Sequence, residues 1–183
     1  MLRLIVFIAF SAGLIYVSRA SLLAPRSHGF YRFLAWESIL SLFFLNFEQW
    51  FRDPFSIRSL VSWFLLVASL VPLALGVHQL RILGRPDTRR RGDVPLIGIG
   101  KTTQLVTTGV FGYIRHPLYS SLFLLAWGLF FKNPSLAGGF LALGATAFLL
   151  AMAKVEEEEN IRHFGPAYQS YMRQTKMFIP FFF

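Results

Sequence analysis

The sequence predicts an all-α polytopic membrane protein with about five transmembrane helices. Three observations predict this fold class: an apolar composition, five separate apolar segments, and basic residues concentrated in alternate loops. Of the 183 residues, 55% are hydrophobic and 15% are charged, and the mean hydropathy is +0.53. This composition is too apolar for an ordinary soluble domain. The length suits a single domain, because each crossing of a bilayer needs about 20 mostly apolar residues plus a connection.

The five apolar segments are interpreted as spanning helices. They cover roughly Leu4 to Val17, Phe30 to Phe51, Ile57 to Leu80, Leu118 to Phe131 and Leu136 to Ala153. The first resembles a signal peptide, but no small-x-small cleavage site closes it, so we expect it to remain as a helix. The fourth is short, and the turn that contains Pro134 separates it from the fifth. We expect one domain over residues 1–183, with three helices in 1–80 and a second half in 81–183.

The basic residues predict the orientation of these helices. The chain carries 18 Lys and Arg against 9 Asp and Glu, a formal charge of +9. Basic loops beside a membrane explain this excess better than a nucleic-acid partner does. With the N-terminus outside, four basic residues lie on the outer side: Arg3, Arg52, Arg58 and Lys132. The cytoplasmic side then holds fourteen: Arg19, Arg26, Arg32, Arg81, Arg85, Arg89, Arg90, Arg91, Lys101, Arg115, Lys154, Arg162, Arg173 and Lys176. The positive-inside rule therefore places the C-terminus in the cytoplasm.

Two long polar stretches fall on the predicted cytoplasmic side. The stretch from Arg81 to Arg115 is rich in Gly, Pro, Arg and Thr and predicts an irregular loop. The stretch from Val155 to Lys176 has apolar residues at near-helical spacing and predicts an interfacial amphipathic helix, broken at Gly165-Pro166. The apolar end, residues 178–183, is expected to tuck back into protein or lipid. The chain has no cysteine, and His78 has no second ligand at metal spacing, so no disulfide or metal site is predicted.

The densest chemical signal lies where the loop meets the fourth apolar segment. Residues 107–119 read TTGVFGYIRHPLY and combine glycines, a cation, an imidazole and a proline suited to a first helical turn. A helix N-terminus beside Arg115 and His116 suits the carboxylate of an amino-acid-like ligand. The structural alternative is a basic membrane anchor with an interfacial tyrosine.

An acidic run, Glu156 to Glu159, follows the fifth apolar segment directly. One explanation is a solvated helix start, because acids favour a helix N-terminus. The other is ligand binding, because a carboxylate can accept hydrogen bonds from both hydroxyls of a ribose. Closeness of this run to His116 would favour ligand binding.

These two signals together resemble the isoprenylcysteine carboxyl methyltransferase and phospholipid methyltransferase superfamily of integral membrane enzymes. The resemblance covers about residues 103 to 181 and rests on order and spacing. Its motifs are the Arg-His-Pro-x-Tyr core that ends at Tyr119, then Glu156-Glu157, Phe164-Gly165, Tyr168 with Tyr171, and Ile179-Pro180. The first three helices carry no motif.

The resemblance implies a cytoplasmic cofactor loop and a site for S-adenosyl-L-methionine. Carried over by position, the cofactor-binding residues are Thr103, Gln104, Leu105, Val106, Phe111, His116, Pro117, Leu118, Tyr119 and Glu156. Phe111 replaces a tyrosine of the isoprenylcysteine enzymes, so a stacking face remains without the hydroxyl. Those enzymes also carry a substrate-binding arginine four residues before the glutamate, and Met152 stands there in this chain. A catalytic base is not fixed, and the candidates are His116, Glu157 and Arg115.

The implied activity is methyl transfer to a hydrophobic or lipid-associated acceptor, which could be a carboxylate, thiol, amine or phenol. The implied partners are the lipid bilayer and that substrate; no nucleic acid is expected, and the oligomeric state stays open. A bacterial inner membrane is the expected location, with the endoplasmic reticulum as the alternative. Three other functions stay open: an NADPH-dependent reductase of the sterol-reductase type, a non-enzymatic membrane protein with the same helices, and a transporter, although no internal repeat supports the last.

The second apolar segment contains acids that need an explanation. Glu37, Ser41 and Glu48 fall on one helical stripe, because eleven residues advance about three turns. Acids within a span are functional candidates. The structural alternative is that Glu37 pairs with an arginine such as Arg32 and that Glu48 lies at the outer end beside Arg52.

Overall fold

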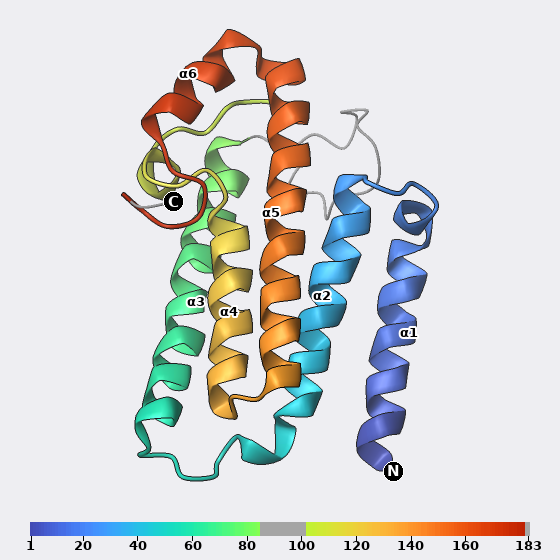
Figure 1. The fold of residues 1–183 in the computed structure, drawn as a ribbon. Helices are drawn as coiled ribbons and strands as arrows, with labels where there is room; N and C mark the ends of the chain where they lie inside the picture. Colours follow the sequence, from blue (N-terminus) through green and yellow to red (C-terminus); the bar gives the residue numbers. More distant parts are fainter. Residues whose placement is uncertain (85–101, 182–183) are drawn as a thin grey trace.

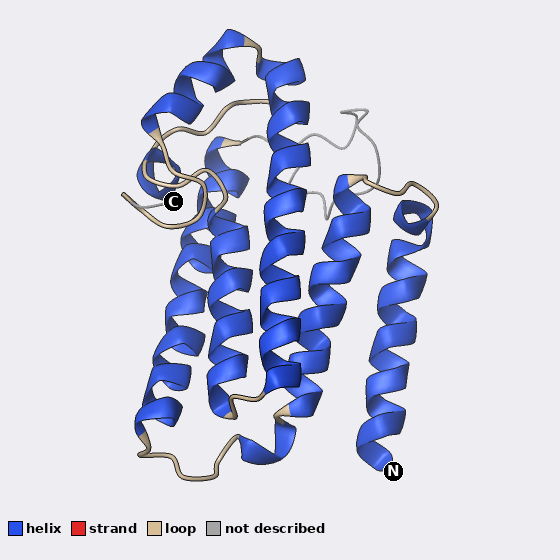
Figure 2. Ribbon diagram, in the orientation of Figure 1, coloured by secondary structure: helices blue, strands red, loops and turns tan. Residues whose placement is uncertain are grey.

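The computed structural model describes residues 1–84 and 102–181 of the chain. In these two ranges the helices are the only extended regular elements (Figure 2), and isolated bridge positions occur at Thr102 and between Ile114 and Lys176. The predicted all-α class is therefore confirmed for the described chain. Most of the predicted cofactor loop, including Arg85, Arg89, Arg90, Arg91 and Lys101, lies outside the described residues.

The described helices follow the apolar segments closely. They are α1 (Leu2–Leu22), α2 (His28–Leu45), the 3-10 turn η1 (Phe47–Gln49), α3 (Ile57–Leu83), the 3-10 turn η3 (Gly109–Gly112), α4 (Pro117–Lys132), α5 (Leu136–Phe164) and α6 (Pro166–Gln174). The side chains of Ser27, Ser56 and Ser135 accept backbone N–H groups at the starts of α2, α3 and α5. Pro117 and Pro166 occupy the first turns of α4 and α6, where no intrahelical N–H is needed.

Three helices, α1, α3 and α5, are long and apolar enough to cross a membrane. This supports the prediction of an integral membrane protein. The helix α4 has only 16 residues, and α2 carries Arg32 and Glu37 within its 18 residues. The count of five crossings therefore remains a prediction, although all five helices run side by side in one bundle (Figure 1).

Two predicted boundaries are wrong. The second helix ends at Leu45 and not at Phe51, because the chain turns at Asn46, whose buried side-chain amide donates to the carbonyl of Leu129 at 2.8 Å. The fifth helix continues to Phe164, so no new helix begins at Val155 and the acidic run lies inside α5. The predicted break at Gly165-Pro166 is confirmed: Gly165 has φ +61°, which favours glycine, and α6 begins at Pro166.

The bundle packs α2 against α5 and α3 against α4 around a core of Ile39, Leu42, Leu66, Ala126, Leu129, Ala142 and Ala145. The contact between α3 and α4 is close at Gly128, where an added Cβ would lie 2.9 Å from Cδ2 of Leu66. The hydroxyl of Ser62 donates to the carbonyl of Gly128 at 2.7 Å, so a polar bond joins the two backbones there. This packing fixes where α4 begins, at the end of the bundle that carries α6 (Figure 1).

Candidate functional site

A cavity of about 350 Å³ lies where the start of α4 meets α2, α3, α5 and α6. This volume falls in the range of about 300–1,000 Å³ that is common for small-molecule sites. The residues that line it come from both chemical signals of the sequence, the motif around His116 and the acidic run of α5. The fold therefore brings together two motifs that are about forty residues apart in the chain.

The structure brings together most of the predicted cofactor residues. Leu105, Val106, Phe111, His116, Pro117, Leu118, Tyr119 and Glu156 line the cavity. Thr103 and Gln104 do not: both are exposed, and their N–H groups donate to the carbonyl of Gly84 at 3.0 and 3.3 Å. Thr102 lines the cavity in their place.

Of the acidic run, Glu156 is the residue that lines the cavity. The hydroxyl of Tyr119 donates to Oε2 of Glu156, and Nδ1 of His116 lies 3.5 Å from the same oxygen. On the other side, Nε2 of His28 lies 2.7 Å from the Tyr119 hydroxyl oxygen. The rings of His116 and Tyr119 are stacked with centroids 5.1 Å apart. The acidic run is thus close to His116, and its position inside α5 excludes the explanation as a helix start.

Glu157 and Arg115 form an ion pair beside the cavity, with Nε and Oε1 2.6 Å apart and both side chains nearly buried. The same guanidinium donates through Nη1 to the carbonyls of Met172, at 3.1 Å, and Thr175. Nε2 of His116 lies 3.3 Å from Oε1 of Glu157. Arg115 is therefore bound to the last turn of α6 and to Thr175 directly after it, and two of its three guanidinium nitrogens already have partners.

The C-terminal segment closes this end of the bundle. The N–H of Arg115 donates to the carbonyl of Lys176 at 2.8 Å, and the N–H of His116 donates to that of Met177 at 3.2 Å. The hydroxyl of Ser120 donates to the carbonyl of Phe178 at 2.7 Å, and Phe178 itself is buried. The predicted tucking of the apolar end is confirmed at Phe178, whereas Phe181 is exposed.

The charge of His116 depends on its two acidic neighbours. Burial lowers the pKa of His116, but the hydrogen bonds and negative charges of Glu156 and Glu157 outweigh burial and raise the pKa above its ordinary value of 6.5. A raised pKa in the folded state stabilises the fold fully below pH 6.5, and this contribution is lost as the pH rises through the folded pKa.

We therefore expect the melting temperature of the wild type to exceed that of His116→Gln at pH 6, and the difference to shrink toward pH 9. Each 1 kcal/mol of lost stability should lower the melting temperature by about 2–4 °C. Thermal unfolding across this pH range measures the difference. His78→Gln is the control, because His78 is exposed on α3. A difference that stays constant with pH would contradict a charged His116.

The contribution of α2 to this cavity was not predicted from the sequence. His28, Arg32 and Trp36 all line the cavity, although no motif marks this helix. The available signal was their spacing, because residues four apart share one helical face. The suggested pairing of Glu37 with Arg32 is wrong: Glu37 accepts the hydroxyl of Ser11, and no ion pair joins Arg32 to an acid in the described residues. Glu48 pairs with Arg3 at 3.0 Å.

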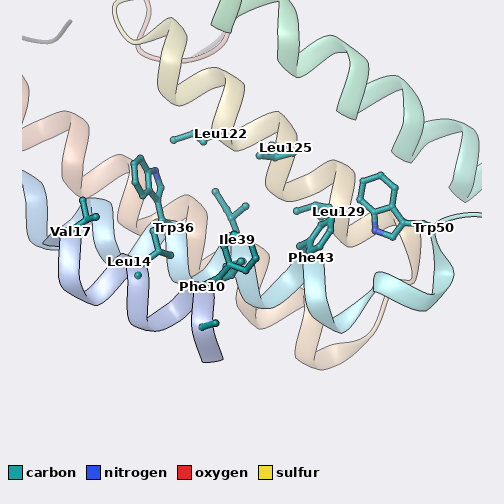
Figure 3. Close-up of a pocket in the computed structure, with 13 residues that line it drawn as sticks. Phe10, Leu14, Val17, Trp36, Ile39, Phe43, Trp50, Leu122, Leu125 and Leu129 are labelled. Carbon is teal, nitrogen blue, oxygen red and sulfur yellow. The ribbon is translucent and has the colours of Figure 1, made fainter. Parts of the chain in front are cut away.

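A second, almost entirely apolar groove of about 790 Å³ lies between α1, α2 and α4 (Figure 3). Phe10, Leu14 and Val17 of α1 face Ile39 and Phe43 of α2 across it. Two residues, Trp36 and Leu122, line both this groove and the cavity around Glu156. The polar site therefore borders an apolar surface that a hydrophobic molecule can occupy.

Comparison with known proteins gives a family match over the site-bearing part of the chain. The phospholipid methyltransferase family matches residues 95–167. The resemblance to the isoprenylcysteine carboxyl and phospholipid methyltransferase superfamily is therefore confirmed. The match with this family covers the motif around His116, the acidic run and the turn at Gly165, and it leaves α1, α2 and α3 outside.

Individual relatives match over 69 to 81 residues. A methanethiol S-methyltransferase of Crocosphaera subtropica is 32% identical over 41% of this chain and 29% of its own length. Methanethiol S-methyltransferase 2 of Bradyrhizobium diazoefficiens is 38% identical over 37% of this chain and 25% of its own length. The nickel-cobalt-cadmium resistance protein NccN of Alcaligenes xylosoxydans xylosoxydans is 36% identical over 44% of this chain and 38% of its own length. The chain thus spans between a quarter and two fifths of these relatives, and no solved structure gives a significant match.

Proposed function

We propose that the chain is an S-adenosyl-L-methionine-dependent methyltransferase that acts on a hydrophobic or lipid-associated acceptor at the cytoplasmic membrane face. One observation carries this proposal: Glu156 lies in one cavity with His116 and Tyr119, two of the motif residues that the superfamily resemblance assigns to the cofactor. The family match over residues 95–167 supports it.

The described residues fit the proposed cofactor chemically. The carboxylate of Glu156 can accept hydrogen bonds from ribose hydroxyls, and Phe111 offers a buried aromatic face for stacking. At the start of α4 the imidazole of His116 lines the same cavity, and its positive charge would attract the carboxylate of an amino-acid part. When bound, the cofactor supplies an electrophilic methyl group on a sulfonium. The task of the chain is then to align that methyl group with the acceptor, and alignment alone can lower a barrier by about 7–11 kcal/mol.

The three candidate catalytic residues receive different weights in this proposal. Arg115 and Glu157 are paired with each other, and Arg115 also donates to the carbonyls of Met172 and Thr175, so we assign both to positioning the start of α4. The raised pKa of His116 favours its charged form, which cannot take a proton from the acceptor. An acceptor that arrives already ionised has no proton to lose, so it needs no catalytic base among these residues.

The acceptor is proposed to be apolar, because the groove between α1, α2 and α4 shares Trp36 and Leu122 with the cavity. Two of the relatives are named for methanethiol, which favours a thiol among the four acceptor classes. A bacterial inner membrane with a cytoplasmic C-terminus is the proposed location, which agrees with the basic residues around the site. A reductase is not favoured by the comparisons.

The test is calorimetric binding of S-adenosylhomocysteine and of NADPH to the purified chain in lipid nanodiscs. The proposal expects micromolar binding of S-adenosylhomocysteine and none of NADPH. Transfer of labelled methyl from S-adenosylmethionine to long-chain thiols, carboxylates, amines and phenols then identifies the acceptor class. Binding of NADPH alone would favour a reductase, and binding of neither compound would favour a non-enzymatic membrane protein.

A further inference from the structure

Arg32 is a buried cation that no acid of the described chain neutralises. It lies in the second turn of α2 and is 7% exposed. Its Nε atom is buried without a hydrogen-bond partner, and none of the described ion pairs includes it. The ring of Trp36 lies beside it, with its centroid 5.6 Å from the guanidinium carbon.

A buried charge without a partner is costly, so its presence in the wall of a cavity needs a reason. Glu156 and Glu157 do not neutralise this charge. Glu156 is engaged by Tyr119 and His116, and Glu157 is engaged by Arg115. Arg32 therefore presents an unneutralised positive charge to whatever occupies the cavity.

The position of Arg32 indicates what kind of molecule occupies the cavity. Trp36, one turn further along α2, is shared between the cavity and the apolar groove, so Arg32 stands close to the boundary between polar and apolar surfaces. Met152 of α5 lines the same cavity and is fully buried, and its apolar side chain cannot neutralise Arg32.

We propose that Arg32 binds the anionic head group, a thiolate or carboxylate, of an amphiphilic methyl acceptor. That the bound anion is the methyl acceptor rests on the proposed function, whereas the anion site itself rests on the geometry alone. A planar guanidinium can pair with a carboxylate through two parallel hydrogen bonds, and its charge stabilises a thiolate over a thiol. The same charge repels an ammonium group, so Arg32 selects against amines. A guanidinium would equally bind the carboxylate of the cofactor, and the experiment separates the two.

The experiment measures binding of octanoate and octylammonium by calorimetry in nanodiscs of uncharged lipid, with empty nanodiscs subtracted. Wild type is compared with Arg32→Met, Arg32→Lys and the control Lys154→Met, which removes an exposed cation of α5. We expect octanoate to bind wild type and Lys154→Met equally, and Arg32→Met at least about 10-fold more weakly, since hydrogen bonds to charged groups contribute about 1.5–3 kcal/mol. Arg32→Lys should lie between them, because it keeps the charge and loses the paired geometry. Octylammonium should not bind wild type.

A second readout separates ligand binding from a structural role. Removing an unneutralised buried charge should leave the melting temperature unchanged or raise it, whereas loss of a structural residue would lower it. Affinity for S-adenosylhomocysteine should stay within about twofold in Arg32→Met, well below the tenfold loss that 1.4 kcal/mol would cause. An equal loss of octanoate and S-adenosylhomocysteine would overturn the proposal and assign Arg32 to the cofactor.

Two further results have clear meanings. Octanoate that fails to bind wild type, or that binds Arg32→Met as well as wild type, would overturn the anion site. Octanoate binding that depends on Arg32 in a chain that does not bind S-adenosylhomocysteine would support the anion site while removing methyl transfer as its purpose.

Discussion

Replacing Glu156 with glutamine is expected to weaken binding of S-adenosylhomocysteine by at least about 30-fold and to remove methyl transfer with it. Truncating one partner of a buried, hydrogen-bonded charged pair costs about 2–5 kcal/mol, and each 1.4 kcal/mol is tenfold in affinity. Glutamine keeps the shape of the side chain and can accept one hydrogen bond, but it loses the charge that strengthens both ribose contacts. Calorimetry on the variant in nanodiscs measures the loss.

The chain offers a matched control for this prediction in Glu158→Gln. Glu158 belongs to the same acidic run of α5 but is exposed and does not line the cavity. The Glu158→Gln variant should bind S-adenosylhomocysteine as the wild type does. Equal binding by Glu156→Gln, in a protein with an unchanged melting temperature, would place the cofactor somewhere other than this cavity.

Much of the fold was predictable because apolar segments of sufficient length must become helices in a bilayer. The end of the fifth helix was not predictable, because by composition alone Glu156 and Glu157 are polar residues that end a membrane span. In the structure they point to His116 and Arg115, so tertiary partners replace the water that such acids otherwise need. The helix α5 can therefore continue to Phe164 without a break.

The same distinction explains the site. The order of the motifs was sufficient to predict that Phe111, His116, Tyr119 and Glu156 share one site, because each belongs to a pattern of fixed spacing. The structure places all four in one cavity. Arg32 belongs to no pattern, and its position depends on how α2 packs against α5, which the sequence of α2 alone does not encode. A polar residue within an apolar helix marks a candidate, but only the packing shows that Arg32 faces a cavity and lacks an acid partner.

Replacing Arg115 with methionine is expected to destabilise the protein more than any change on its surface. The ion pair between Arg115 and Glu157 is almost buried, and removing one partner of such a pair costs about 3–5 kcal/mol because the other charge is left uncompensated. The variant also loses the bonds to the carbonyls of Met172 and Thr175. The melting temperature should fall by roughly 6–20 °C, at about 2–4 °C for each 1 kcal/mol.

The double variant Arg115→Met, Glu157→Met distinguishes the ion pair from simple packing. If the cost arises mainly from the stranded carboxylate of Glu157, the double variant should recover a large part of the lost stability, because two apolar side chains can replace a buried ion pair at little cost. Arg173→Met, an exposed change on α6, should leave the melting temperature nearly unchanged. Equal losses in the single and double variants would show instead that the bonds of Arg115 to the segment after α6 carry the stability. In both cases cofactor binding should weaken with the fold, since the segment that Arg115 holds also pairs with the backbone of His116 at the start of α4.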